Sequence, residues 1–120
     1  MSMIDTPLMR GLESVLDRSA FRHQVIAANL ANIDTPGYRT RDVREFAGEI
    51  EQAMAGEAAS FTPIAHEIPG LLERPDGNNV SVERESLLLA QNQLRFTVAV
   101  AFLKSEFHTL SSAINGGTTS

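Results

Sequence analysis

The chain has 120 residues, of which 42% are hydrophobic and 21% charged, a composition that fits one folded domain with a modest core. Only 6% are aromatic and none is tryptophan, which argues against an aromatic-rich β-sandwich. The net charge of −5, with acidic residues interleaved among the arginines of the first third, argues against nucleic-acid binding. The absence of cysteine excludes disulfides and thiolate chemistry without fixing the compartment.

The first predicted element is a helix over residues of about 7–34. Thr6 can cap its start and Pro7 suits its first turn. Apolar residues then recur in steps close to three and four, as on one face of a helix. A polar group interrupts this stripe midway, which fits either a wet patch between helices or a contact with another subunit: Ser19, Arg22 and His23.

A rigid turn over residues 35–41 is predicted to end this helix. Thr35 precedes Pro36, and a residue before proline is disfavoured in the α region. Pro36 and Gly37 suit the two central positions of a type II turn, because proline sets φ at the first and glycine supplies a positive φ at the second. Tyr38, the only tyrosine, follows as an aromatic anchor.

The stretch around this turn resembles the signature near the N-terminus of bacterial flagellar axial proteins, the family of rod, hook and hook-associated subunits. Its residues are Asn29-Leu30-Ala31-Asn32 followed by Thr35-Pro36-Gly37-Tyr38-Arg39. Asn29 and Asn32 stand three apart and share one helix face. The resemblance implies that six residues serve assembly at this junction: Asn29, Asn32, Thr35, Pro36, Gly37 and Tyr38.

The middle of the chain is predicted to hold a short helix over about 42–55 and an irregular or hairpin loop over 57–80. Asp42 suits the N-cap of the short helix, with Glu45 completing a capping box. Prolines and glycines then break the periodicity, and Asp76-Gly77 is a pair typical of a hairpin turn.

The last predicted element is a helix over about 82–115, followed by a tail over 116–120. Ser81 suits its N-cap, and acidic residues in its first turn complement the helix dipole. A heptad-type seam runs along it, formed by Phe96, Val100, Leu103, Phe107, Leu110 and Ile114. Nearly opposite lies a second apolar stripe of Leu87, Leu94, Val98 and Ala101. Because a chain of this size cannot cover both sides of so long a helix, neighbouring subunits are predicted to cover the second stripe.

The residues therefore favour an all-α fold with long N- and C-terminal helices, and the resemblance implies that these pack as an antiparallel coiled-coil hairpin. Further matches indicate a rod subunit of the proximal type: Asp76-Gly77-Asn78-Asn79-Val80, Ala90, Asn92, Leu94, Arg95-Phe96 and the ending Ile114-Asn115-Gly116-Gly117. The whole chain is expected to be a single rod-type domain.

The function that the resemblance implies is that of a structural subunit of the proximal rod, polymerising into the axial tube that transmits torque and passes exported proteins. The implied partners are other rod subunits, the adaptor between the MS ring and the rod, and the flagellar export gate. The expected location is the periplasmic rod of the basal body. No apolar segment typical of a cleavable signal precedes Arg10, so export without one is expected. No membrane span is predicted either.

Three other interpretations remain open at this point: another axial rod subunit, a non-flagellar α-helical adaptor, and a small enzyme or metal protein. The last has little support, since His23, His66 and His108 fall on separate predicted elements without partners at ligand spacing. No nucleophile elbow or phosphate-binding glycine loop is present. No enzyme activity, cofactor or metal is predicted.

Overall fold

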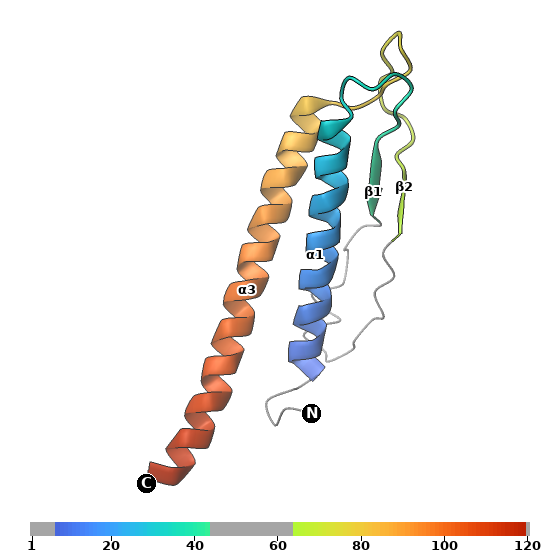
Figure 1. The fold of residues 1–120 in the computed structure, drawn as a ribbon. Helices are drawn as coiled ribbons and strands as arrows, with labels where there is room; N and C mark the ends of the chain where they lie inside the picture. Colours follow the sequence, from blue (N-terminus) through green and yellow to red (C-terminus); the bar gives the residue numbers. More distant parts are fainter. Residues whose placement is uncertain (1–6, 44–63, 120) are drawn as a thin grey trace.

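The computed structural model describes residues 7–43 and 64–119. In chain order the elements are α1 (Pro7–Ala31), β1 (Arg41–Val43), β2 (Ala65–Glu67) and α3 (Val82–Thr119). α1 and α3 lie side by side and antiparallel, and β1 packs beside α1, with β2 on the far side of β1 (Figure 1). The molecule is elongated, measuring 71 × 22 × 21 Å. The predicted hairpin of two long helices is confirmed.

α1 ends three residues before the predicted boundary at residue 34. The Asn32 N–H still bonds the Ala28 carbonyl at 3.1 Å, but the Thr35 N–H bonds the Asn32 carbonyl at 3.0 Å. The latter bond closes a tight turn in place of another helical turn. The chain therefore leaves the helix before the restriction from Pro36 applies.

The prediction of a helix beginning at Asp42 is wrong, because Arg41–Val43 forms β1. β1 pairs antiparallel with β2, and Asp42 faces His66 across the pair. The Asp42 carboxylate binds Arg22 of α1 through two hydrogen bonds of 3.0 and 2.9 Å. A long-range ion pair has thus replaced the local capping box. The rest of that predicted helix, residues 44–55, lies outside the described residues.

Asp76-Gly77 forms the turn that its sequence indicates. The Gly77 N–H bonds the Arg74 carbonyl at 2.8 Å, and the Arg74 N–H bonds the Asn78 carbonyl at 2.8 Å. Gly77 has φ +85°, in the left-handed region. This is the three-residue hairpin turn in which glycine follows a type I turn.

α3 spans 38 residues and includes the pair Gly116-Gly117 that was expected to end it. Its start is capped as predicted, since the Ser81 hydroxyl accepts a hydrogen bond of 3.2 Å from the Arg84 N–H. Figure 1 shows the C-terminal end of α3 extending past the start of α1.

The side of α3 that is buried is more polar than the predicted seam. Two heptad-spaced rows are buried or half-buried: Glu85, Asn92, Ala99 and Glu106 form one, and Leu89, Phe96, Leu103 and Leu110 form the other. Val100 is half-buried, but Phe107 and Ile114 are 46% and 48% exposed, so their placement on the seam is wrong. A row made of acids, an amide and an alanine carries no apolar periodicity, so the sequence pattern did not indicate it.

The second apolar stripe of α3 lies exposed, as predicted. Leu87, Leu94 and Val98 are 59%, 64% and 51% exposed, and Ala101 is also exposed. We call these four residues the outer stripe. By length and composition alone, with a mean hydropathy of 1.2, Val82–Gly116 would suffice to cross a membrane. The sequence predicts no membrane span because it contains no unbroken apolar run of about 18 residues. α3 reaches this hydropathy because apolar residues lie on several of its faces around Asn92 and Arg95.

Candidate assembly junction

Asn29, near the end of α1, is fully buried and binds three other parts of the chain. Its Nδ2 donates to the Arg41 carbonyl at 2.8 Å and to Glu85 Oε2 at 3.0 Å. Its Oδ1 accepts from the Tyr38 hydroxyl at 3.0 Å and from the Arg41 N–H at 3.1 Å. Both N–H groups and both acceptor positions of the amide are thus used. We call Asn29, Tyr38, Arg41 and Glu85 the junction cluster.

The Asn29 amide binds the backbone of Arg41 much as a residue of a neighbouring strand would. It accepts from the N–H and donates to the C=O of the same residue, the pattern exchanged by two hydrogen-bonded residues of an antiparallel pair. On its other edge, β1 pairs with β2. Asn29 therefore satisfies backbone groups of β1 that would otherwise face the side of α1 without partners.

Glu85 brings a carboxylate from the first turn of α3 into this cluster. Its side chain is fully buried and accepts hydrogen bonds from Asn29 and from Arg84 Nη1, the latter at 2.8 Å. A buried charge persists only where such partners replace water. The sequence placed Glu85 in the first helical turn, where anions suit the dipole, but gave no signal of a contact with Asn29.

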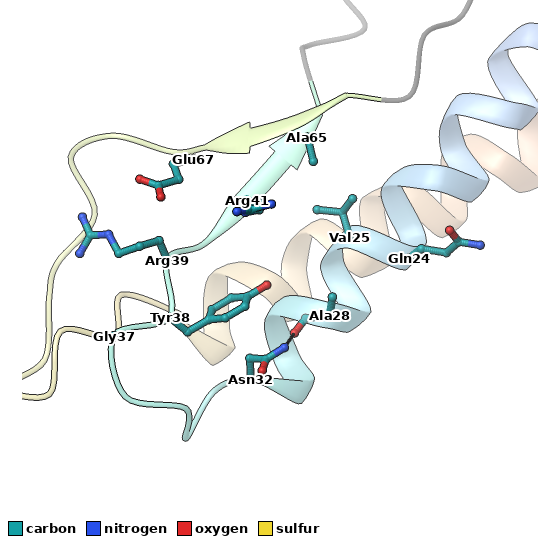
Figure 2. A pocket seen from close by; sticks show the side chains of 10 residues that line it. All are labelled: Gln24, Val25, Ala28, Asn32, Gly37, Tyr38, Arg39, Arg41, Ala65 and Glu67. Atoms are coloured by element: carbon teal, nitrogen blue, oxygen red, sulfur yellow. Dashed lines mark hydrogen bonds between the residues drawn. The ribbon is translucent and has the colours of Figure 1, made fainter.

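Tyr38 supplies the aromatic part of the cluster, and its side chain reaches from the turn toward α1 (Figure 2). Burial raises the pKa of its phenol above the ordinary value; the nearby Arg41 charge opposes this rise and the Glu85 charge adds to it. The phenol therefore stays protonated at neutral pH and can donate to Asn29.

The turn itself has the predicted geometry. The Tyr38 N–H bonds the Thr35 carbonyl at 3.2 Å, and Gly37 has φ +74°. With Pro36 at the preceding position, this is a type II turn. The Thr35 hydroxyl binds Asn32 Oδ1 at 3.0 Å, while Asn32 Nδ2 donates to the Ala28 carbonyl at 2.8 Å. Asn32 thus stabilises the end of α1.

The two glycine turns touch each other. The Gly37 N–H bonds the Asp76 carbonyl at 2.9 Å, and a Cβ on Gly77 would lie 3.4 Å from Gly37 Cα. Asn78, which is fully buried, donates to the carbonyls of Asn32 and Thr35, both at 2.9 Å. The fold therefore brings together the Pro36-Gly37 turn and the Asp76-Gly77 turn, although they lie 40 positions apart in the sequence.

Further polar contacts hold the segment that leads into α3. Thr40 donates two hydrogen bonds to Asn79: its N–H donates to Asn79 Oδ1 at 2.6 Å, and its hydroxyl donates to the Asn79 carbonyl at 3.1 Å. Arg74 donates to the Val80 carbonyl at 2.8 Å and to the Ile33 carbonyl, two residues past the end of α1. The roles of Thr40 and Arg74 were not predicted from the sequence. The only signal was the Asn78-Asn79 pair, which lies close to Arg74 along the chain.

Arg22 explains part of the polar interruption on α1. Its guanidinium binds Asp42 with both oxygens engaged, and the two side chains are only 11% and 9% exposed. Such a paired geometry is specific as well as strong. Arg22 therefore holds β1 against α1, which was not among the two roles expected for this patch.

A groove of about 630 Å³ adjoins the junction cluster, between α1, the turn and the two strands, and Tyr38 and Arg41 of the cluster help to line it. Figure 2 shows Arg39, Arg41 and Glu67 on its strand side and Ala28 and Asn32 on its helix side. Within residues 7–43 and 64–119, no group of three metal-ligating side chains occurs. The junction therefore holds separate segments of the chain together by hydrogen bonds.

Comparison with known proteins supports the same family that the sequence motif resembles. The family of flagella basal body rod proteins matches residues 14–39, which run from α1 through the type II turn to Arg39. The flagellar basal body rod protein FlgB of Salmonella typhimurium is 32% identical, covering 91% of this chain and 94% of its own length. The FlgB proteins of Bacillus subtilis and Escherichia coli are 30% and 28% identical with the same coverage.

The helical hairpin, the junction and these relatives define a structural protein of the flagellar basal-body rod, a class without enzymatic activity. Within that class, the chain belongs to the FlgB family of flagellar basal body rod proteins. The predicted family and the function as a rod subunit are thereby confirmed, and rod proteins of this family assemble with other rod subunits. The assembly roles of the individual junction and stripe residues remain predictions.

Proposed function

We propose that this chain polymerises with other rod subunits through the outer stripe of α3, forming an axial tube that transmits torque and passes exported proteins. The observation that carries the proposal is the exposure of Leu87, Leu94 and Val98 on one long helix. Burying a leucine side chain is worth about 1.5–3 kcal/mol, so a row of them in water is costly unless a neighbour covers it.

Lipid could also cover an apolar helix, but the residues of α3 favour protein. Arg95 lies within the apolar part of the helix, and Asn92 and Gln93 adjoin it. A charged side chain at the centre of a bilayer costs about 2.5–3.5 kcal/mol even on the most permissive scale. In a protein assembly, the exposed side chains of Arg95 and Gln93 can stay in water while the outer stripe is buried.

We extend the proposal to two neighbours at the base of the rod, the adaptor that joins it to the MS ring and the flagellar export gate. We also propose that the chain reaches the periplasm through the export apparatus without a cleaved signal. Both follow from the resemblance to axial proteins. Cross-linking from the outer stripe in isolated basal bodies would identify the neighbours.

Replacing Leu94 with Asp tests the role of the outer stripe. A charge at the centre of a buried interface should abolish rod assembly, leaving few or no complete basal bodies by electron microscopy and no swimming in a strain that lacks the natural gene. The matched control is Gln93→Asp, an exposed neighbour outside the stripe, which should assemble normally. Normal rods with Leu94→Asp would show that the stripe is not an interface.

A further inference from the structure

Asn92 and Ser19 form a polar contact within the interface between α1 and α3. Both are 1% exposed, and Asn92 Nδ2 donates to the Ser19 carbonyl at 2.8 Å. Asn92 Oδ1 and Ser19 Oγ are buried without a hydrogen-bond partner among the described residues. Such atoms lower stability relative to an apolar contact. In coiled coils, a polar residue on the seam is retained at such a cost because it specifies register.

The spacing of both helices gives Asn92 one suitable position. On α1, Leu12, Ser19 and Ile26 are heptad-spaced and buried, and Ser19 is the only small residue of the three. Its short side chain leaves its carbonyl within reach of Asn92. A slip by one heptad would place Asn92 against Leu12 or Ile26, whose larger side chains occupy that space.

The same slip would break the junction cluster. Glu85 lies one heptad before Asn92 on α3, and it reaches Asn29 only in the observed register. A slipped pair would bury the Glu85 carboxylate without its Asn29 partner, which is unfavourable. The apolar row of Leu89, Phe96, Leu103 and Leu110 repeats at each heptad and so discriminates poorly between these registers.

We propose that Asn92 and Ser19 are positioning residues that fix the register of α1 against α3. A fixed register sets the distance along the molecular axis between the outer stripe and the type II turn. An assembled neighbour would therefore contact the stripe and the turn at a constant spacing. This role concerns the single chain, and its test does not depend on the outer stripe being an interface.

Because the natural chain has no cysteine, paired cysteines can report the register of the full-length protein. Val15→Cys with Ala99→Cys reports the observed register, since these residues pack in one core cluster. Val15→Cys with Glu106→Cys reports a slip by one heptad in one direction. Leu8→Cys with Ala99→Cys reports the slip in the other direction. Disulfide yield under mild oxidation is the measurement.

With Asn92 and Ser19 intact, only the first pair should cross-link efficiently. Asn92→Leu should raise the yield of at least one slipped pair about tenfold, the factor expected from losing one interhelical hydrogen bond to an apolar contact. Ser19→Leu should do the same because it fills the space that admits Asn92. Ser19→Ala keeps the small side chain and the carbonyl, and should retain the observed register.

An Asn92→Leu protein that cross-links only through the first pair would overturn the proposal. Loss of helicity by circular dichroism together with loss of all three cross-links would also overturn it, because Asn92 would then be required for folding itself. A slipped register in Ser19→Ala would assign the selectivity to the serine hydroxyl and contradict the role given to its carbonyl.

Discussion

The buried amide of Asn29 has few substitutes among the other side chains. Position 29 requires a planar side-chain group that can lie along the edge of β1, donate two hydrogen bonds and accept two more. Aspartate would offer acceptors only and would face the Glu85 carboxylate. Asparagine is therefore dictated by hydrogen-bond chemistry at this position, where helix propensity alone would favour other residues.

Replacing Asn29 with Ala should lower the free energy of unfolding by about 3 kcal/mol, because it leaves the Glu85 carboxylate and the Arg41 backbone with fewer partners. Urea unfolding followed by circular dichroism would measure the loss. The control is Asn32→Ala, whose side chain bonds in an exposed setting and should cost about 1 kcal/mol or less. Equal losses would contradict the central place given to Asn29.

Tyr38 should make stability depend on pH in the alkaline range. Its pKa is raised in the folded chain, so the folded state holds the phenolic proton more tightly than the unfolded state does. The stability from this difference is fully present below the unfolded pKa of about 10 and is lost as the pH rises through the folded value. Tyr38→Phe should remove this dependence in unfolding experiments at alkaline pH.

The tyrosinate absorbance offers a direct check, because the chain contains one tyrosine and no tryptophan. Its titration in the native protein should be displaced to higher pH than in the urea-unfolded chain. Coincident titrations would contradict the assignment of a half-buried, hydrogen-bonded phenol. At neutral pH, Tyr38→Phe should cost only about 1 kcal/mol, the typical value of one hydrogen bond.

Between elements, both glycine turns depend on a residue with positive φ. Gly77→Ala should destabilise the protein by about 1–2 kcal/mol through its φ of +85°, because the added Cβ, 3.4 Å from Gly37 Cα, makes only an ordinary contact. Gly70→Ala is the matched control, since Gly70 has φ +81° and nothing within 4 Å of an added Cβ. Thermal unfolding should therefore show similar losses of stability for the two variants, and a much larger loss for Gly77→Ala would contradict this assignment.

The elements also show what can be predicted from the sequence. The two helices, the Pro36-Gly37 turn and the outer stripe follow from local chemistry: a proline, a glycine, and apolar residues at helical spacing. The pairing of Asp42 with Arg22 did not follow, because the local capping pattern was outweighed by a partner 20 positions away. Periodicity likewise gives no information on which buried polar groups will meet, as with Asn29 and Glu85.

At the scale of the whole molecule, the two ends of the hairpin differ. The end near the type II turn is held by the junction cluster, whereas residues 112–116 of α3 are exposed. Figure 1 shows this end of α3 extending past the start of α1. The outer stripe and this exposed end belong to one helix, so a single element presents most of the apolar surface that the structure exposes.

Removing residues 111–120 should therefore separate folding from assembly. The stability of the hairpin should change by less than about 1 kcal/mol, since a surface change away from the core has a small effect. Rod assembly should fail, because a neighbour would lose part of the surface of α3. Urea unfolding of the truncated chain and electron microscopy of basal bodies would provide the two readings. Complete rods would exclude this end from the assembly surface.

The junction cluster has a consequence for any process that delivers the chain from its N-terminus. Asn29 and Glu85 stand 56 positions apart, so most of the chain must emerge before the two can meet. Until then the Asn29 amide lacks one of its partners, and α3 has not emerged to pack against α1. Closing so long a loop is the entropically costly step, and local contacts cannot replace it. The subunit therefore stays open for most of its delivery and closes late, when the start of α3 arrives.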